Sequence, residues 1–114
     1  MLYNVTYILI MEIEFRINKM KKAYENIKKL RREYGSQQAE EIVKRINELQ
    51  NAPTLYDISK LPQARLHPLS GTLNGHFAVD LKHPYRMILL PLNGEISDYN
   101  TITKIQIYDI KDYH

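Results

Sequence analysis

The apolar residues of this chain change their spacing once, near Pro62, from a helical period to a strand period. Between Met20 and Tyr34 they recur every three or four positions, and a second such stripe runs from Ala39 to Leu49. This spacing is typical of two amphipathic helices. After Pro62, apolar and polar residues tend to alternate, as in strands with one buried face. Helices followed by strands predict an α+β fold.

The helices and the strands can be bounded from their flanking residues. Gly35 is expected to end the first helix, Ser36 to cap the second, and Asn51-Ala52-Pro53 to end it, giving an antiparallel helical hairpin. A first strand is expected at Ile13 to Ile17. After Pro62 three or four strands are expected, with candidates at Ala64 to Leu69, His76 to Leu81, Tyr85 to Leu92 and Thr103 to Ile110. The predicted order is β-α-α-β-β-β, with the hairpin covering one face of a small, twisted, mostly antiparallel sheet.

Two Asn-Gly pairs predict the turns between the later strands. Asn74-Gly75 and Asn93-Gly94 suit type I′ turns, in which both central residues have positive φ. The second pair also fits a longer loop that runs to about Asn100.

The length of 114 residues predicts one domain, which we place at residues 11–114. Residues 1–10 are interpreted as an extension or an extra strand. They are apolar but far shorter than the roughly 20 residues that span a bilayer, so we expect no membrane partner. The absence of cysteine excludes disulfides, a thiolate nucleophile and cysteine zinc sites, and fits the cytoplasm. The histidine spacing and the glycine pattern indicate no metal and no nucleotide cofactor.

Positive charge is concentrated in the first helical segment. Residues 19–32 contain seven lysines and arginines and a single acidic residue, Glu25. Such a surface suits a polyanion, either a nucleic acid or an acidic protein segment. The alternative is an ordinary solvated helix face.

Two histidines are candidates for catalysis: His67, in the run Arg65-Leu66-His67-Pro68-Leu69, and His114, which follows Asp112-Tyr113. Two imidazoles around one phosphodiester can divide the acid and base work of RNA cleavage, in an order that the sequence does not assign. Arg86 can supply positive charge to the phosphate, and Tyr113 can stack on a base or hydrogen-bond the phosphate. Each of the four residues also has an ordinary structural explanation.

Four segments follow one another in the chain: Ala64 to Gly71, Gly75 to Leu81, His83-Pro84-Tyr85-Arg86 and Asp112-Tyr113-His114. In this order and at this spacing they resemble HigB-type toxins, the plasmid-maintenance killer proteins. These toxins belong to the RelE/ParE superfamily of bacterial toxin–antitoxin systems. The resemblance covers roughly Met11 to His114. It implies a RelE-like fold and a ribosome-dependent mRNA endonuclease that stops translation without a metal. By position it marks His67, Arg86, Tyr113 and His114 as active-site residues.

The resemblance also implies the partners of the protein. A HigA-type helix-turn-helix antitoxin would neutralise it, and the protein would reach operator DNA only within that complex. The residues expected to bind RNA or the ribosome are Arg65, Lys82, Lys21, Lys22, Lys28, Lys29, Arg31 and Arg32. Ser70 departs from the family, because many relatives have a lysine there, and Lys82 is a candidate to replace that contact.

Two alternatives remain open at the level of the sequence. One is a ParE-like inhibitor of DNA gyrase, although such proteins generally lack the paired histidines. The other is a catalytically degenerate toxin that acts only as an antitoxin-binding co-regulator.

Overall fold

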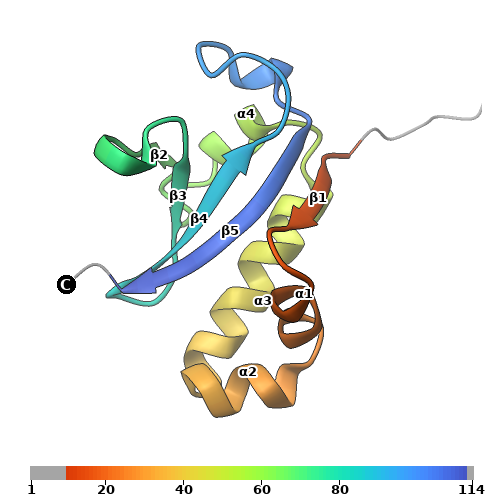
Figure 1. The fold of residues 1–114 in the computed structure, drawn as a ribbon, viewed down its shortest axis with the longest axis vertical. Helices are drawn as coiled ribbons and strands as arrows, with labels where there is room; N and C mark the ends of the chain where they lie inside the picture. The colour runs from red at the N-terminus through yellow and green to blue at the C-terminus, as the bar shows by residue number, and fades with distance from the viewer. Residues whose placement is uncertain (1–9, 113–114) are drawn as a thin grey trace, which may run out of the picture.

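A computed structural model describes residues 10–112 of the chain, in which five strands form one mixed sheet (Figure 1). The strands are β1 (Glu12–Phe15), β2 (His67–Pro68), β3 (Phe77–Asp80), β4 (Tyr85–Pro91) and β5 (Lys104–Asp112). Their order across the sheet is β1-β5-β4-β3-β2. The β1 strand is parallel to β5, and the other three pairs are antiparallel. The predicted α+β class and the mostly antiparallel sheet are therefore confirmed.

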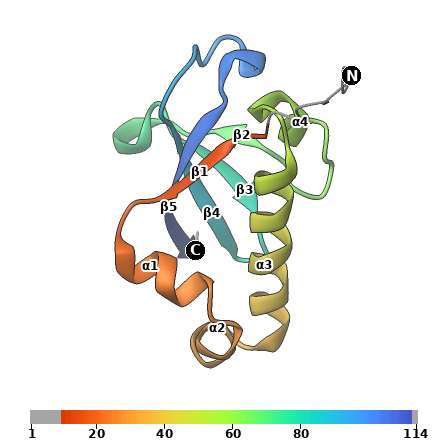
Figure 2. The same cartoon turned by 90° about the vertical axis from the view of Figure 1, so that its right-hand side faces the viewer.

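Four helices lie between β1 and β2 in the sequence: α1 (Asn18–Tyr24), α2 (Ile27–Tyr34), α3 (Ser36–Asn51) and α4 (Leu55–Ser59). The longest, α3, runs along one face of the sheet, as the two perpendicular views show (Figures 1 and 2). Within residues 10–112, no helix combines the length and the apolar character needed to cross a bilayer.

The core lies between α3 and the sheet. Residues that alternate along the strands, such as Val79, Met87 and Ile107, are fully buried and meet Ile42 and Leu49 of α3 in one cluster. Neighbouring strand residues point to the opposite face of the sheet. Among residues 10–112 no α-helix is packed over that second face, which we call the open face (Figure 2). It carries Asp80 and Arg86, although Ala78 and Ile88 on the same face are fully buried.

The first predicted helix is wrong as a continuous element, because it divides into α1 and α2. The Asn26 side chain accepts hydrogen bonds from the backbone N–H groups of Lys28 and Lys29, so it caps a new helix. The predicted antiparallel hairpin is wrong as well, since α2 lies across the lower end of α3 (Figures 1 and 2).

The boundaries of α3 and α4 also correct the sequence prediction. Gly35 ends α2, as predicted, but it is also the residue before α3, so Ser36 is the first residue of that helix and not its cap. The α4 helix was not predicted. Its start is fixed by Thr54 and Asp57, whose side chains exchange hydrogen bonds with each other's backbone N–H groups.

The strand predictions hold for β1, β3, β4 and β5 within a few residues, whereas β2 contains only His67–Pro68. Arg65 has a φ of 45°, which no strand residue adopts, so the strand cannot begin at Ala64. The type I′ turns are wrong. Asn74 has a φ of −55°, and at the second pair Gly94 alone has positive φ. The second pair does open a loop past Asn100, as predicted.

The prediction of a domain at residues 11–114 stays a prediction. The interpretation of residues 1–10 as an extension or extra strand falls, apart from Ile10, outside the described residues.

Two tyrosines join α1 to α2. Burial is the largest cause that raises the pKa of Tyr24 far above its ordinary value, and its hydroxyl donates a hydrogen bond to Tyr34. Burial also raises the pKa of Tyr34. In both cases the folded protein favours the neutral phenol. This stabilisation is complete below the pKa of the unfolded chain, about 10, and is lost as the pH rises above it.

We predict that Tyr24→Phe will make the protein less sensitive to alkali. At pH 11 the wild-type protein should have lost about 1 kcal/mol more of its unfolding free energy, relative to pH 8, than the variant has. Urea unfolding at several pH values measures this difference. Tyr56→Phe, which changes an exposed tyrosine, is the matched control and should follow the wild-type profile. Parallel profiles for wild type and Tyr24→Phe would contradict the assignment.

Candidate functional site

Two of the predicted site residues, His67 and Arg86, lie on the open face of the sheet, and the unpredicted Asp80 lies there with them. In the strand register His67 is opposite Ala78, Asp80 is opposite Arg86, and Arg86 is opposite Lys111. Residues two apart on a strand share a face, so these side chains project from the side away from α3. Arg86 lies two strands across from His67 and two residues along the strand, which puts their backbones about 12 Å apart. The structure therefore brings His67 and Arg86 to one surface.

The imidazole of His67 is held in one tautomer. Its Nδ1 lies 2.7 Å from the carbonyl oxygen of Arg65. A carbonyl can only accept, so Nδ1 carries the proton and Nε2 of the neutral ring holds a lone pair. Among the described residues Nε2 has no hydrogen-bond partner and is shielded from solvent. A substrate that uses this nitrogen must therefore displace the atoms that cover it.

A carboxylate lies between two arginines beside this histidine. Arg65 donates from Nε and Nη2 to the two oxygens of Asp80, at 2.6 and 3.1 Å, and Arg86 Nε is 3.8 Å from Asp80 Oδ1. The hydrogen bonds from Arg65 and the charge of Asp80 raise the pKa of the Arg65 guanidinium above its ordinary value. The three side chains line a pocket of about 270 Å³ together with His83 and Tyr85.

The backbone around this pocket is held by the buried guanidinium of Arg45, on the side of the sheet that faces α3. Arg45 of α3 is 2% exposed and donates to the carbonyl oxygens of Asp80 and Gln63, at 2.8 and 2.9 Å. Its charge is balanced by Glu41 and Glu48 on the same helix, each at 2.7 Å. Arg45 thus ties α3 to β3 and to the segment that leads into β2.

The turn between β3 and β4 is fixed by a second side chain of α3. The buried Gln38 amide donates to the carbonyl oxygen of Lys82 and accepts from its N–H, both at 2.9 Å. The turn also contributes His83 to a groove of about 410 Å³ that starts at Tyr34, the last residue of α2. This groove shares His83 and Tyr85 with the arginine pocket, so the two hollows are adjacent.

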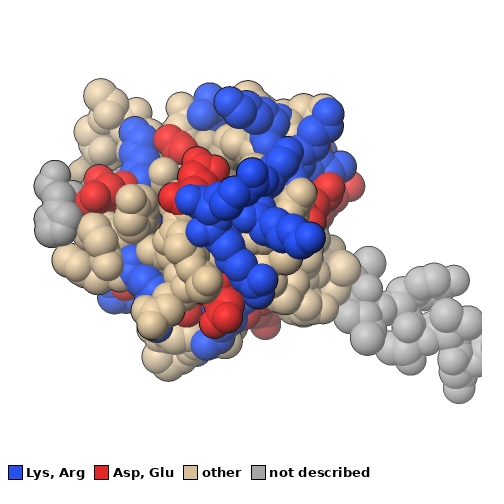
Figure 3. Space-filling model, turned by 90° about the horizontal axis from the view of Figure 1, so that it is seen from below, with Lys and Arg blue, Asp and Glu red and all other residues tan. Residues whose placement is uncertain are grey.

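The predicted RNA-binding residues lie in three parts of the structure. Arg65 lines the arginine pocket, and Lys82 lines the groove. The basic surface, which we define as Lys21, Lys22, Lys28, Lys29, Arg31 and Arg32, is exposed on α1 and α2. Figure 3 shows lysines and arginines gathered on this side of the molecule. The groove begins where α2 ends, so it lies between the basic surface and the pocket.

The remaining predicted catalytic residues, Tyr113 and His114, lie outside the described residues. The chain is described as far as Asp112, which is opposite Tyr85 on β4, one position from Arg86. Asp112 is therefore paired with a residue that lines the arginine pocket.

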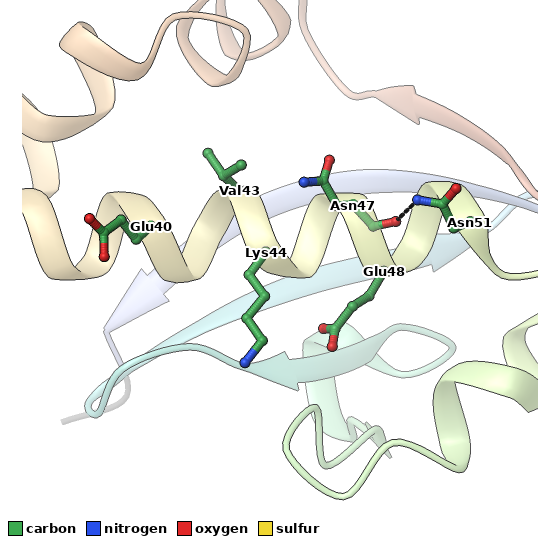
Figure 4. A pocket seen from close by; sticks show the side chains of 6 residues that line it. All are labelled: Glu40, Val43, Lys44, Asn47, Glu48 and Asn51. Carbon is green, nitrogen blue, oxygen red and sulfur yellow. Dashed lines mark hydrogen bonds between the residues drawn. The ribbon is translucent and has the colours of Figure 1, made fainter.

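A larger hollow, of about 520 Å³, lies along the outer side of α3 and does not resemble a site (Figure 4). Val43 and Asn47 project to one side of the helix, and Lys44 and Glu48 to the other (Figure 4). Glu48 is already committed to Arg45 and Gln63. Because the side chains diverge, no ligand would be surrounded there. No group of three or more potential metal ligands occurs among residues 10–112.

Sequence reasoning missed two residues of the site, Asp80 and Arg45. The alternation after Phe77 identified Asp80 only as a polar strand residue. Its place in the sequence between Arg65 and Arg86, on a neighbouring predicted strand, could have indicated an ion pair with these arginines. Arg45 lies in the apolar stripe of the second helix, between Val43 and Ile46. An arginine in such a stripe predicts a buried ion pair.

We predict that Arg45→Met will destabilise the protein by about 3 kcal/mol, because two carboxylates and two carbonyl groups lose their buried donor. Methionine keeps most of the side-chain volume, so the loss reports the polar contacts. Urea unfolding measures it. Lys44→Met, an exposed position on the same helix, is the control and should change stability by less than about 0.5 kcal/mol. Equal stability of the two variants would remove Arg45 from this role.

Arg65, Asp80 and Arg86 line a polar pocket. His67 is not among the lining residues, and its Nδ1 is linked to the pocket through the carbonyl oxygen of Arg65. No protein-family model matches the chain, and no curated protein matches it. The function is therefore argued from these residues and from their geometry.

Proposed function

We propose that this protein is the toxin of a type II toxin–antitoxin system with a RelE-like fold, and that it cleaves mRNA on the ribosome. The observation that carries the proposal is the placement of His67. Its Nδ1 contacts the carbonyl oxygen of Arg65, and the strand register places it on the same face of the sheet as Arg86. A base and positive charge on one surface are two of the three requirements for metal-free RNA cleavage.

In this mechanism His67 is the general base. Nε2 takes the proton from the 2′-hydroxyl of the nucleotide at the cut, and the 2′-oxygen attacks the adjacent phosphorus. The bond from phosphorus to the 5′-oxygen breaks, leaving a 2′,3′-cyclic phosphate and a 5′-hydroxyl. Negative charge builds on the phosphoryl oxygens in the transition state, where Arg86 stabilises it.

His114 supplies the proton that the departing 5′-oxygen needs, and Tyr113 stacks on a base or hydrogen-bonds the phosphate. Two arguments support this division. The tautomer of His67 suits it to accept a proton first. Asp112, the residue before Tyr113 in the sequence, pairs with Tyr85, which lines the pocket.

The ribosome provides the remaining binding energy. The basic surface on α1 and α2 binds ribosomal RNA phosphates, and the groove from Tyr34 to Tyr85 leads from there to the arginine pocket. Lys82 contacts RNA in this groove, where it offsets the absence of a lysine at Ser70. The protein acts in the cytoplasm. A HigA-type helix-turn-helix antitoxin neutralises it, and operator DNA is reached only through that complex.

The first prediction is that induced expression of the wild-type chain cuts mRNA during translation. Primer extension on transcripts from induced cells should show breaks within or beside codons, and these should vanish when initiation is blocked. His67→Gln should lower cleavage by at least about 100-fold, because glutamine offers no basic nitrogen. His76→Gln, which removes an imidazole that lines neither the pocket nor the groove, is the control and should cut mRNA as the wild type does. Intact mRNA together with trapped gyrase–DNA complexes would favour the ParE-like alternative.

A second prediction concerns His114. Its removal should abolish toxicity while melting temperature and antitoxin binding stay close to wild type, since it is proposed to act only as the acid. Growth curves after induction, thermal melts and co-purification with the antitoxin give the three readouts. Full toxicity of the soluble shortened chain would exclude His114 from the mechanism. Harmless wild-type protein that still binds antitoxin would favour the degenerate-toxin alternative.

A further inference from the structure

Asp80 occupies a position where a carboxylate is unfavourable for binding an anion. It lies in the pocket between Arg65 and Arg86, and its charge offsets part of theirs. A negative group beside a phosphate site weakens the attraction between the site and the phosphate. Attraction to an anionic ligand therefore does not explain why a carboxylate lies in this pocket.

The geometry of the Arg65 contact supplies an explanation. A guanidinium can bind a carboxylate or a phosphate with two donors along its side edge, Nε and one Nη, or along its outer edge, both Nη atoms. Asp80 takes the side edge, through Nε and Nη2. Within residues 10–112 no contact is recorded for Nη1, and the Arg65 side chain is 54% exposed. Arg65 lines the pocket, and among residues 10–112 its outer edge is not used by another protein group.

The groups that hold this pair are themselves fixed. The Asp80 N–H donates to the Ala64 carbonyl oxygen at 2.7 Å, and its own carbonyl oxygen accepts from the buried Arg45. Arg65 has a φ of 45°, a conformation that costs free energy for a residue with a side chain. That conformation also places its carbonyl oxygen on His67 Nδ1. One strained residue therefore supplies both the guanidinium and the contact that sets the histidine tautomer.

We propose that Asp80 is a positioning residue, which holds Arg65 side-on so that its outer edge and Arg86 together bind the phosphate at the cut. The inference rests on the proposed function and extends it: Arg65 is a second phosphate ligand of the reaction centre, and Asp80 acts through it. Asp80 does not touch the substrate.

Positioning and simple charge balance predict opposite results for Asp80→Asn. Loss of the carboxylate removes a repulsive charge, so binding of RNA in the ground state should stay equal or tighten. A guanidinium that is no longer held should lower the rate of the chemical step, since small displacements in an active site cost ten- to a hundredfold. We expect kcat to fall at least about tenfold with no rise in KM.

The test is a cycle of four proteins: wild type, Asp80→Asn, Arg65→Gln and the double variant, assayed on ribosome-bound mRNA. If Asp80 acts through Arg65, the double variant cuts as slowly as Arg65→Gln alone. Glu12→Gln is the matched control, because it changes a carboxylate to an amide in an exposed ion pair with Lys104, and it should keep wild-type kcat. Full activity of Asp80→Asn, or an equal loss in both backgrounds, would overturn the inference.

A second measurement separates this inference from the proposed function. Inorganic phosphate is titrated into the isolated protein while the Nε–H signals of Arg65 and Arg86 are followed by NMR. We expect both signals to shift together with one midpoint, and Asp80→Asn to speed solvent exchange of the Arg65 signal. If wild type cuts no mRNA but this result holds, the endonuclease proposal fails and the anion site stands. An Arg65 signal that ignores phosphate would overturn the site.

Discussion

The buried guanidinium of Arg45 is the interaction on which the open face of the sheet depends. A charge that is 2% exposed is tolerated only when its donors are used, and here Glu41, Glu48 and two carbonyl groups accept from it. The carbonyl groups belong to Gln63 and Asp80, on segments that are far apart in the sequence. The contacts of Arg45, which lies on the side of the sheet that faces α3, therefore set the distance between Gln63 and Asp80. The segments of these two residues also carry the polar side chains of the opposite face.

The conformation of Arg65 follows from that constraint. Gln63 is held to α3, and Ala64 accepts from the Asp80 N–H, so the chain has very few residues in which to turn into β2. Arg65 makes the turn with positive φ, at a cost that the surrounding contacts offset. In return its carbonyl oxygen meets His67 and its side chain meets Asp80. Strain and site geometry thus have the same origin.

The sequence predicted the parts of the fold that depend on local patterns. Apolar periodicity located α3, β3, β4 and β5, and Gly35 ended α2. It could not locate the break at Asn26, because the apolar stripe continues through it and only a side-chain cap divides the helix. The short β2 was overestimated for a related reason. Its limit is the φ of Arg65, which long-range contacts to α3 and β3 impose.

The same distinction applies to the candidate site. His67 and Arg86 could be chosen by residue type, and the strand register does place them on one face. The tautomer of His67 could not be predicted, since it depends on a carbonyl oxygen that only a left-handed Arg65 presents. Asp80 was overlooked because opposite charges on neighbouring strands usually indicate an ordinary surface pair. What distinguishes this pair is that both backbone groups of Asp80 are hydrogen-bonded, the N–H to Ala64 and the carbonyl oxygen to Arg45. The position from which its carboxylate projects is therefore fixed.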